Sequence, residues 1–281
     1  MATRKKKTPS PTETPDAVLR APAEVEYAKQ LEALFQAERD QAPASWKLSP
    51  RSVLRYIVGS ETLPLKVGKA TEEVPITRKF FGDDALVERA IVTLASERAL
   101  LLVGEPGTGK SWLSEHLAAA VAGDSTLVIQ GTAGTTEDQI KYSWNVARVI
   151  AEGPTPDNLI PSPTLVAMQR GGLLRFEEIT RCVPDVQDAL VSILSDKAVA
   201  IPELPGANRR EAKAGFNVIA TANSRDQGVN DLSAALKRRF NYVHIPIVAD
   251  KKTEMAIVEQ RSKELLARYA IPATVERPVI D

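Results

Sequence analysis

Short runs of apolar residues recur through the middle of this chain and are separated by stretches of helical periodicity. The runs occupy residues 100–103, 126–129, 173–176, 216–220 and 242–247. Because they are continuously apolar rather than alternating, they fit strands that are buried on both faces of a parallel sheet. With helices between them, they predict an α/β fold in which helices flank a parallel sheet.

Helical patterns also precede and follow this region. Apolar residues at helical spacing predict one amphipathic helix across residues 24–39 and another after residue 247. A helix beginning near residue 50 is well delimited, with Ser49 as the N-cap, Pro50 in the first turn and Gly59 at the C-terminal cap. Asp83 can cap the helix that opens the central region. We therefore expect a helical hairpin before the α/β region and a helix after it.

Composition narrows the class of protein. Of 281 residues, 43% are hydrophobic and 26% are charged, as in ordinary globular proteins. Lys and Arg together number 36, and Asp and Glu also number 36, so the balance of charge argues against a nucleic-acid partner. No apolar run approaches the roughly 20 residues of a membrane span, and Cys182 is the only cysteine. These features favour a cytoplasmic protein without a membrane partner.

A glycine-rich segment lies between the first apolar run and a helical stretch. It matches the phosphate-binding P-loop pattern without a mismatch, through Gly104, Glu105, Pro106, Gly107, Thr108, Gly109, Lys110 and Ser111. Glycines let backbone N–H groups turn toward a phosphate, and the helix N-terminus adds positive potential. Lys110 should reach the β and γ phosphates, and Ser111 should hold Mg²⁺. Trp112 follows directly and completes the expected ATP-binding set.

Two acidic residues, Glu177 and Glu178, follow the apolar run at 173–176. Glu177 is expected to hold the metal and Glu178 to act as the general base for the attacking water. The competing interpretation is a pair of solvated charges at a strand end. The residue at the first position is usually Asp, so the extra methylene of Glu177 bears on the geometry of Mg²⁺ and on turnover.

Two further elements come later in the chain. Asn223 follows the run at 216–220, where a short amide can lie between the γ-phosphate and the attacking water. Arg238 and Arg239 end a helical stretch before the last run and could stabilise charge on a neighbouring subunit's γ-phosphate. Basic residues are also common at an ordinary helix C-terminus, so this second element is less specific.

Taken in order, these elements resemble the AAA+ superfamily of ATPases and, within it, the MoxR group. The segment Leu173-Leu174-Arg175-Phe176-Glu177-Glu178-Ile179-Thr180-Arg181 resembles the acidic motif of MoxR proteins. Phe80-Phe81-Gly82 resembles the segment that packs on adenine, so Phe81 and Gly82 join the expected nucleotide-binding residues. Asn223 fits the sensor-1 position, and Arg239, with Arg238 as its rival, fits the arginine finger.

The resemblance also implies an architecture. It implies a five-stranded parallel sheet of order 5-1-4-3-2, a helix-2 insertion at 131–172 and a β-hairpin at 195–215. The expected domains are a disordered tail at 1–23, an N-terminal helical region at 24–76, an AAA+ core at 77–247 and the start of a helical lid at 248–281. We expect this lid to be incomplete and to lack a sensor-2 arginine, because Arg261 and Arg268 have no recognisable sequence context.

The function implied by the resemblance is Mg²⁺-dependent ATP hydrolysis in a ring, expected to be hexameric, with sites completed by a neighbouring subunit. MoxR proteins imply a chaperone-like role in remodelling protein clients, with a von Willebrand factor A-domain partner. A motor stimulated by nucleic acid is an alternative, kept open by basic residues at 209–213. A scaffold that binds ATP but hydrolyses little is another, suggested by Glu177 and the short lid.

Overall fold

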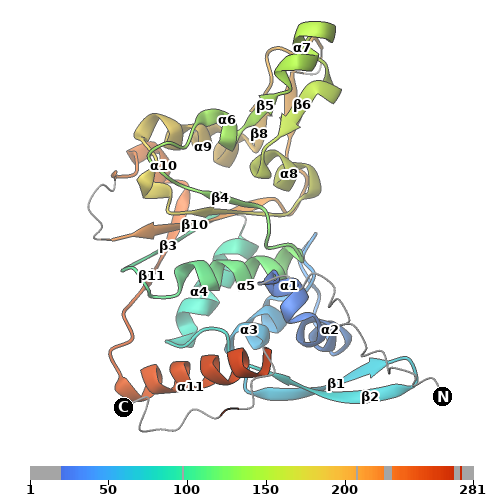
Figure 1. The fold of residues 1–281 in the computed structure, drawn as a ribbon, viewed down its shortest axis with the longest axis vertical. Coiled ribbons are helices and arrows are strands. Elements are labelled where there is room, and N and C mark those ends of the chain that lie inside the picture. Colours follow the sequence, from blue (N-terminus) through green and yellow to red (C-terminus); the bar gives the residue numbers. More distant parts are fainter. Residues whose placement is uncertain (1–19, 97, 207, 225–229, 269–272, 274–281) are drawn as a thin grey trace, which may run out of the picture.

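A parallel sheet forms the centre of the protein, with helices on both of its faces (Figure 1). The computed structural model describes residues 20–96, 98–206, 208–224, 230–268 and 273. Most of the tail expected at residues 1–23 lies outside these residues.

The sheet has five strands in the order β11-β3-β10-β7-β4. All four pairings between neighbouring strands are parallel. Numbered along the chain within this sheet, the order is 5-1-4-3-2, which confirms the expected topology. The strands are β3 (Ala99–Gly104), β4 (Val128–Gln130), β7 (Leu173–Glu177), β10 (Asn217–Asn223) and β11 (Phe240–Ile245).

Each face of the sheet contributes to a separate apolar core, because successive side chains of a strand point to opposite faces. Leu100 and Leu102 of β3 pack with the core that includes α4 (Asp84–Ala95) and α5 (Lys110–Ala122). Leu101 belongs to the opposite core, with α8 (Pro163–Arg170) and α9 (Pro184–Asp196). Burial on both faces explains why the central strand β3 is continuously apolar in sequence.

The N-terminal region is only partly helical. It contains α1 (Ala23–Glu26), α2 (Ala28–Gln36) and α3 (Pro50–Val58), so the helix expected at 24–39 is interrupted at Tyr27. The caps of α3 are as expected: the Ser49 side chain accepts from the Ser52 N–H, and Gly59 has a φ of 68°.

A β-hairpin, absent from the sequence prediction, follows α3. Strands β1 (Glu61–Val67) and β2 (Ala70–Ile76) pair in antiparallel register from Glu61↔Ile76 to Val67↔Ala70. Burial is sparse along both strands, with Leu65, Val74 and Ile76 as their buried residues. Because so few positions are buried, the alternating pattern is weak in the sequence, which explains why the hairpin was missed.

Two insertions extend the α/β core. The segment expected as a helix-2 insertion contains α6 (Glu137–Ile140), β5 (Tyr142–Trp144), α7 (Val146–Glu152), a 3-10 turn (Pro156–Asn158) and β6 (Leu159–Pro161). It projects from the sheet, with α7 at its tip (Figure 1). The expected hairpin before β10 is also present, as β8 (Ala198–Ala200) paired with β9 (Arg209–Glu211).

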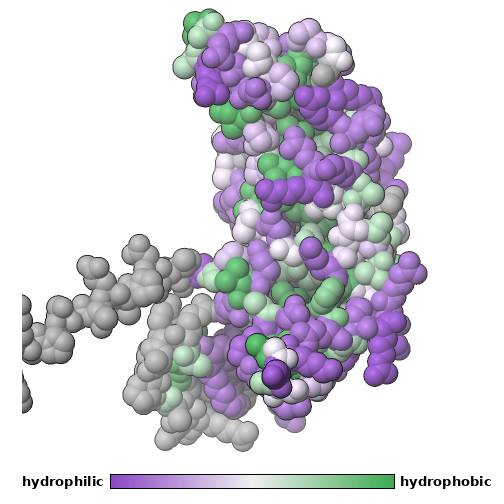
Figure 2. All heavy atoms as spheres, turned by 90° about the vertical axis from the view of Figure 1, so that its right-hand side faces the viewer, coloured by the Kyte–Doolittle hydropathy of each residue, from purple (hydrophilic) through white to green (hydrophobic). Residues whose placement is uncertain are grey.

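The chain then continues through α10 (Ala234–Lys237) and β11 to α11 (Lys251–Arg268). Helix α11, in red in Figure 1, crosses the side of the molecule that carries the β1–β2 hairpin. Helix α11 is the helix expected at the start of the lid region. In the part of the chain that the structure describes, no helix is long and apolar enough to cross a membrane. Apolar side chains are visible at the tip of the insertion (Figure 2), where Val146 and Ile150 of α7 are exposed.

Candidate nucleotide site

The glycine-rich loop joins β3 directly to α5, as the P-loop pattern predicts. Gly107 and Gly109 have φ values of 80° and 82°, a region that side chains other than glycine rarely adopt. A Cβ on Gly104 would lie 2.4 Å from the carbonyl oxygen of Ile245 on β11, so glycine is required there for packing. The Lys110 Nζ lies over the loop and donates to the carbonyls of Gly104 (3.1 Å) and Glu105 (2.7 Å).

The carboxylate of Glu177 lies directly against the first turn of α5. Its Oε2 accepts from the Ser111 hydroxyl at 2.7 Å and from the Thr221 hydroxyl at 2.8 Å. Its Oε1 accepts from the Ser114 hydroxyl at 2.5 Å and from the Arg175 guanidinium at 2.9 Å. Glu177 therefore bonds to α5, β7 and β10 at once.

Glu178 occupies a left-handed turn at the end of β7, with a φ of 53° and a ψ of 45°. Its N–H donates to the Thr221 hydroxyl at 2.9 Å, so one threonine holds both acidic residues. The carboxylate Oε2 is 2.7 Å from Nε of Arg181, which follows in a 3-10 turn (Ile179–Arg181). Gly131, after β4, passes so close that a Cβ there would lie 2.4 Å from the Glu178 carbonyl oxygen.

Three more of the expected residues lie beside this centre. Asn223 is opposite Gly104 in the β10–β3 register, so it ends its strand next to the P-loop. Phe81 and Gly82 follow Lys79, whose carbonyl accepts from the Trp112 indole N–H at 2.8 Å. The structure therefore brings the P-loop, both acidic residues, Asn223 and the segment at 80–82 together around the start of α5.

Arg238 and Arg239 lie away from the P-loop, at the opposite end of the strands. They precede β11, and Phe240 pairs with Ala99 at the start of β3, whereas the P-loop follows the opposite end of that strand. A strand of this length spans roughly 16 Å at about 3.3 Å per residue. The Arg239 side chain contacts the Ser195 hydroxyl and the Ala235 carbonyl, and Arg98 donates to the Arg238 carbonyl at 2.6 Å. Neither arginine joins the site of its own chain.

The residues present fit a nucleotide with Mg²⁺. The Ser111 hydroxyl and the Glu177 carboxylate are 2.7 Å apart and are hard oxygen donors of the kind that Mg²⁺ prefers. At Gly107 and Gly109, an added Cβ would have no neighbouring atom within 4 Å, so the loop is open where phosphate would approach. The longer side chain of Glu177, a departure from the usual Asp, is accommodated by the additional donors Ser114 and Arg175.

The sequence analysis gave no role in the site to five residues of this centre: Arg175, Arg181, Ser114, Thr221 and Gly131. Arg175 and Arg181 appeared there only as members of the acidic motif. Arg175 had a visible signal, because it is a charge within an apolar strand and lies two residues before Glu177, on the same face. Ser114 is three residues after Ser111, which places the two hydroxyls on one side of α5. Thr221 and Gly131 carry no comparable local signal, since their roles depend on neighbouring strands.

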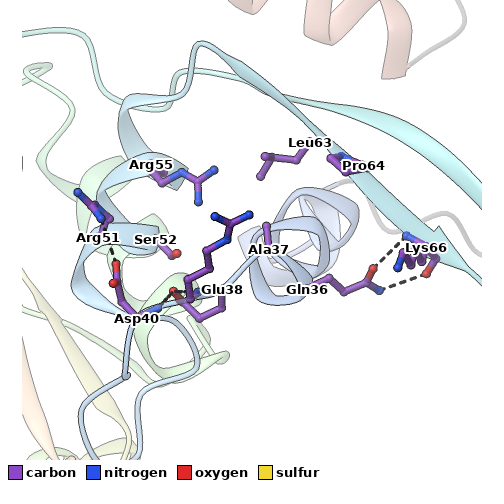
Figure 3. Close-up of a pocket in the computed structure, with 11 residues that line it drawn as sticks. Gln36, Ala37, Glu38, Asp40, Arg51, Ser52, Arg55, Leu63, Pro64 and Lys66 are labelled. Atoms are coloured by element: carbon purple, nitrogen blue, oxygen red, sulfur yellow. Dashed lines mark hydrogen bonds and ion pairs between the residues drawn. The ribbon is translucent and has the colours of Figure 1, made fainter.

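A separate cavity of about 930 Å³ lies between α2, α3 and β1 (Figure 3). Arg55 points into it and pairs with Glu61 at 2.8 and 2.7 Å, while Arg51 is 3.6 Å from Asp40. None of its lining residues belongs to the P-loop or to the ends of β7 and β10. This cavity is lined by charged residues, but the residues that fit phosphate binding are those of the P-loop.

Comparison with known proteins agrees with this geometry. Residues 99–240, half of the chain, match the family described as AAA domain (dynein-related subfamily). The Escherichia coli protein YehL, which is described as uncharacterised, is 46% identical over 263 residues, covering 93% of this chain and 70% of YehL. The gas vesicle ATPase GvpN2 of Halobacterium salinarum is 27% identical over 215 residues, covering 71% of this chain and 62% of GvpN2.

A solved structure supports the fold. NtrX from Brucella abortus, in complex with ADP, superimposes with a TM-score of 0.51 at 15% identity, covering 70% of this chain and 43% of the NtrX chain. This protein thus spans less than half of NtrX and less than two thirds of GvpN2. The family match over half of the chain, the 46% identity to YehL and the P-loop at the start of α5 lead to one conclusion: the chain belongs to the AAA-domain proteins of the dynein-related subfamily.

Proposed function

We propose that the protein is a Mg²⁺-dependent ATPase of the MoxR type that works as a ring. The observation that carries this proposal is the network in which Glu177 joins Ser111 of the P-loop to Thr221 of β10. Thr221 also accepts from the backbone N–H of Glu178. The network supports the proposal, because it holds Ser111, Glu177 and Glu178 together beside the P-loop, where ATP hydrolysis needs a metal-binding pair and a carboxylate base.

Each residue has a role in this scheme. Lys110 and the P-loop N–H groups would bind the β and γ phosphates, and Ser111 with Glu177 would hold Mg²⁺. Bound Mg²⁺ would supply neutralisation of phosphate charge. Glu178 would accept the proton of the attacking water, and Asn223 would orient that water. Phe81 and Gly82 would contact the adenine.

Assembly into a ring is supported by the position of the arginines, and six subunits is the number that the family resemblance implies. Because Arg238 and Arg239 are about one strand length from their own P-loop, they could reach phosphate only in a neighbouring subunit. They lie in a pocket of about 380 Å³ whose described lining also includes the basic residues Arg98 and Lys197. Such a basic pocket fits an anion from a second subunit.

The proposed biological role is remodelling of protein clients in the cytoplasm, with a von Willebrand factor A-domain protein as a partner. The projecting insertion supports it, because Val146 (67% exposed) and Ile150 (82% exposed) present apolar surface at its tip. One similar protein, GvpN2, is itself named an ATPase.

The test is phosphate release from ATP with Mg²⁺ over a range of protein concentrations. Activity should rise more steeply than protein concentration, because each active site needs a neighbour. Lys110→Ala should abolish ATP binding, whereas Glu178→Gln should bind ATP without turnover. Mixing Lys110→Ala with the Arg238→Ala/Arg239→Ala variant should restore part of the activity, since mixed rings contain sites with both functions. Tight ATP binding by Lys110→Ala would contradict the assignment.

A scaffold that binds ATP but hydrolyses little is the second candidate. It is favoured by two ion pairs, because Arg175 neutralises Glu177 and Arg181 pairs with Glu178. ATP binding without phosphate release at any protein concentration would select this candidate over the ATPase.

A further inference from the structure

Three residues from distant parts of the chain meet beside the P-loop: Lys79, Trp112 and Arg261. Trp112 follows Ser111 in the first turn of α5, and its indole N–H donates to the Lys79 carbonyl at 2.8 Å. The guanidinium of Arg261, on α11, lies 4.0 Å from the centroid of the Trp112 ring. The same guanidinium is 3.4 Å from the Lys79 carbonyl. We call this group the Trp112 junction.

The backbone around Lys79 is held from two further sides. The N–H groups of Lys79 and Phe80 both donate to the Ile57 carbonyl at the end of α3, at 2.8 and 3.3 Å. Gln260 of α11 donates to the Arg78 carbonyl at 2.8 Å. Helices α3, α5 and α11 therefore all bond to the segment that leads directly into residues 80–82.

The side chain of Lys79 anchors this segment in the N-terminal region. It is only 2% exposed, and its Nζ lies 4.6 Å from the ring centroids of both Tyr27 and Tyr56. It also donates to Gln30 at 2.6 Å. The two aromatic rings and the Gln30 side chain enclose this buried amine on several sides, which fixes its position. The Lys79 backbone consequently has little freedom to follow small movements of its neighbours.

We propose that the Trp112 junction sets the spacing between the phosphate end and the base end of the nucleotide site, and transmits occupancy of the site to α11. The proposal rests on the function proposed above. One hydrogen bond spans the two ends, because Trp112 adjoins Ser111 and Lys79 adjoins Phe80. Movement of the first turn of α5 must therefore change the Trp112–Lys79 contact or the stacking of Arg261. Trp112, Lys79 and Arg261 act as positioning residues.

The junction should affect the binding of ATP and not the chemical step. Glu178 follows β7 and Asn223 ends β10, whereas the contacts described for the junction run to α3, α5 and α11, so substitutions at the junction should leave the chemical step intact. Trp112→Phe keeps an aromatic ring and removes the N–H donor. It should raise KM for ATP about fivefold, the loss expected for one hydrogen bond, and change kcat less than about twofold.

Arg261 offers an independent variant on a partly exposed side chain. Arg261→Met removes the charge at similar length and should also raise KM about fivefold, as expected for a lost cation–π contact. Arg261→Lys keeps the cation and should recover part of the affinity. Trp144→Phe is the matched control, because Trp144 lies on β5 in the insertion, and its KM should equal that of the wild type.

Fluorescence provides a readout that a merely structural role would not produce. The chain has three tryptophans, so the Trp46→Phe/Trp144→Phe variant reports on Trp112 alone. In a Glu178→Gln background, which holds ATP without turnover, ATP should change the Trp112 emission. Adding Arg261→Met should shift the emission before ATP is added and reduce the change that ATP causes.

Two results would show that the Trp112 junction does not have the proposed role. If the wild type hydrolyses ATP but Trp112 emission is insensitive to saturating ATP, and both Trp112→Phe and Arg261→Met have unchanged KM, the junction has no such role. If the wild type does not bind ATP at all, the proposed function and this inference fail together. Circular dichroism of each variant, matching that of the wild type, establishes that altered KM does not come from misfolding.

Discussion

The buried ion pair between Arg175 and Glu177 allows a quantitative test of how the site is held together. Both side chains are almost fully buried, at 10% and 5% exposure, and their charged atoms are 2.9 Å apart. Arg175 also donates to the Ser114 hydroxyl and to the carbonyls of Ser111 and Ser125. Arg175→Met would remove these four contacts and leave a buried carboxylate without its cation.

The loss of stability expected for Arg175→Met depends on the hydrogen bonds that Glu177 keeps. Removing one partner of a buried ion pair typically destabilises a protein by about 3–5 kcal/mol. The hydroxyls of Ser111, Ser114 and Thr221 still donate to Glu177, so we expect a value near the lower end, about 3 kcal/mol. For a chain of this size, that corresponds to a fall in Tm of about 6–12 °C.

The assay is urea and thermal unfolding at neutral pH in a double-mutant cycle with Glu177→Gln. Arg175→Met leaves the Glu177 charge buried without its cation, whereas the double variant Arg175→Met/Glu177→Gln lacks that charge. The free energy of unfolding of the double variant should therefore exceed the value expected from adding the two single losses by about 2 kcal/mol. Arg170→Met is the control, since Arg170 pairs with Asp124 but is 65% exposed and should contribute little. Additivity within about 0.5 kcal/mol, or a loss below about 1 kcal/mol for Arg175→Met, would refute this reasoning.

Three further predictions concern single positions. Gly131→Ala should destabilise the protein by about 2 kcal/mol and reduce ATP turnover, because its Cβ would lie 2.4 Å from the Glu178 carbonyl oxygen. Thermal melting and phosphate release would measure the two effects. Gly134→Ala is the control, because the nearest atom to its Cβ would be 3.9 Å away. Burial lowers the pKa of Lys79 from 10.5 to about 7, so the unfolded chain binds more protons between these values and stability should rise with pH above 7. Urea unfolding should show a gain of about 2 kcal/mol from pH 7 to 9 that is missing in Lys79→Met, and an equal gain in both proteins would contradict the assignment to Lys79. Ser49→Ala removes the N-cap of α3 and should cost about 1 kcal/mol in the same assay; no loss would show that the cap does not contribute.

Much of the α/β region could be predicted from sequence, because the patterns that indicate its strands, caps and P-loop each lie within a few neighbouring residues. The strands of the sheet coincide with short, mainly apolar runs, and the P-loop has glycines in its turn, so both are visible within a few residues. Asp83 and Ser49 cap the helices that their positions predict. The strand order came from resemblance to a family, because apolar runs alone do not say which strands are neighbours.

The β1–β2 hairpin and the environment of Lys79 were not predictable in this way. The hairpin buries few side chains, so its alternation is faint. Lys79 reads in sequence as an ordinary surface cation, and it is buried because Tyr27, between α1 and α2, and Tyr56, on α3, approach it. Arg261 had no recognisable sequence context until α11 was placed against Trp112.

The sequence by itself determined the fold class, the P-loop and the identity of the acidic pair, because each depends on the chemistry and spacing of adjacent residues. Only the tertiary structure decided that Glu177 bonds to four side chains, that Arg181 pairs with Glu178, and that Arg238 and Arg239 lie at the far end of the sheet from the P-loop. The physical reason is that hydrogen bonds and ion pairs depend on distances of about 3 Å between atoms. Such distances between residues tens of positions apart are set by the packing of whole strands and helices.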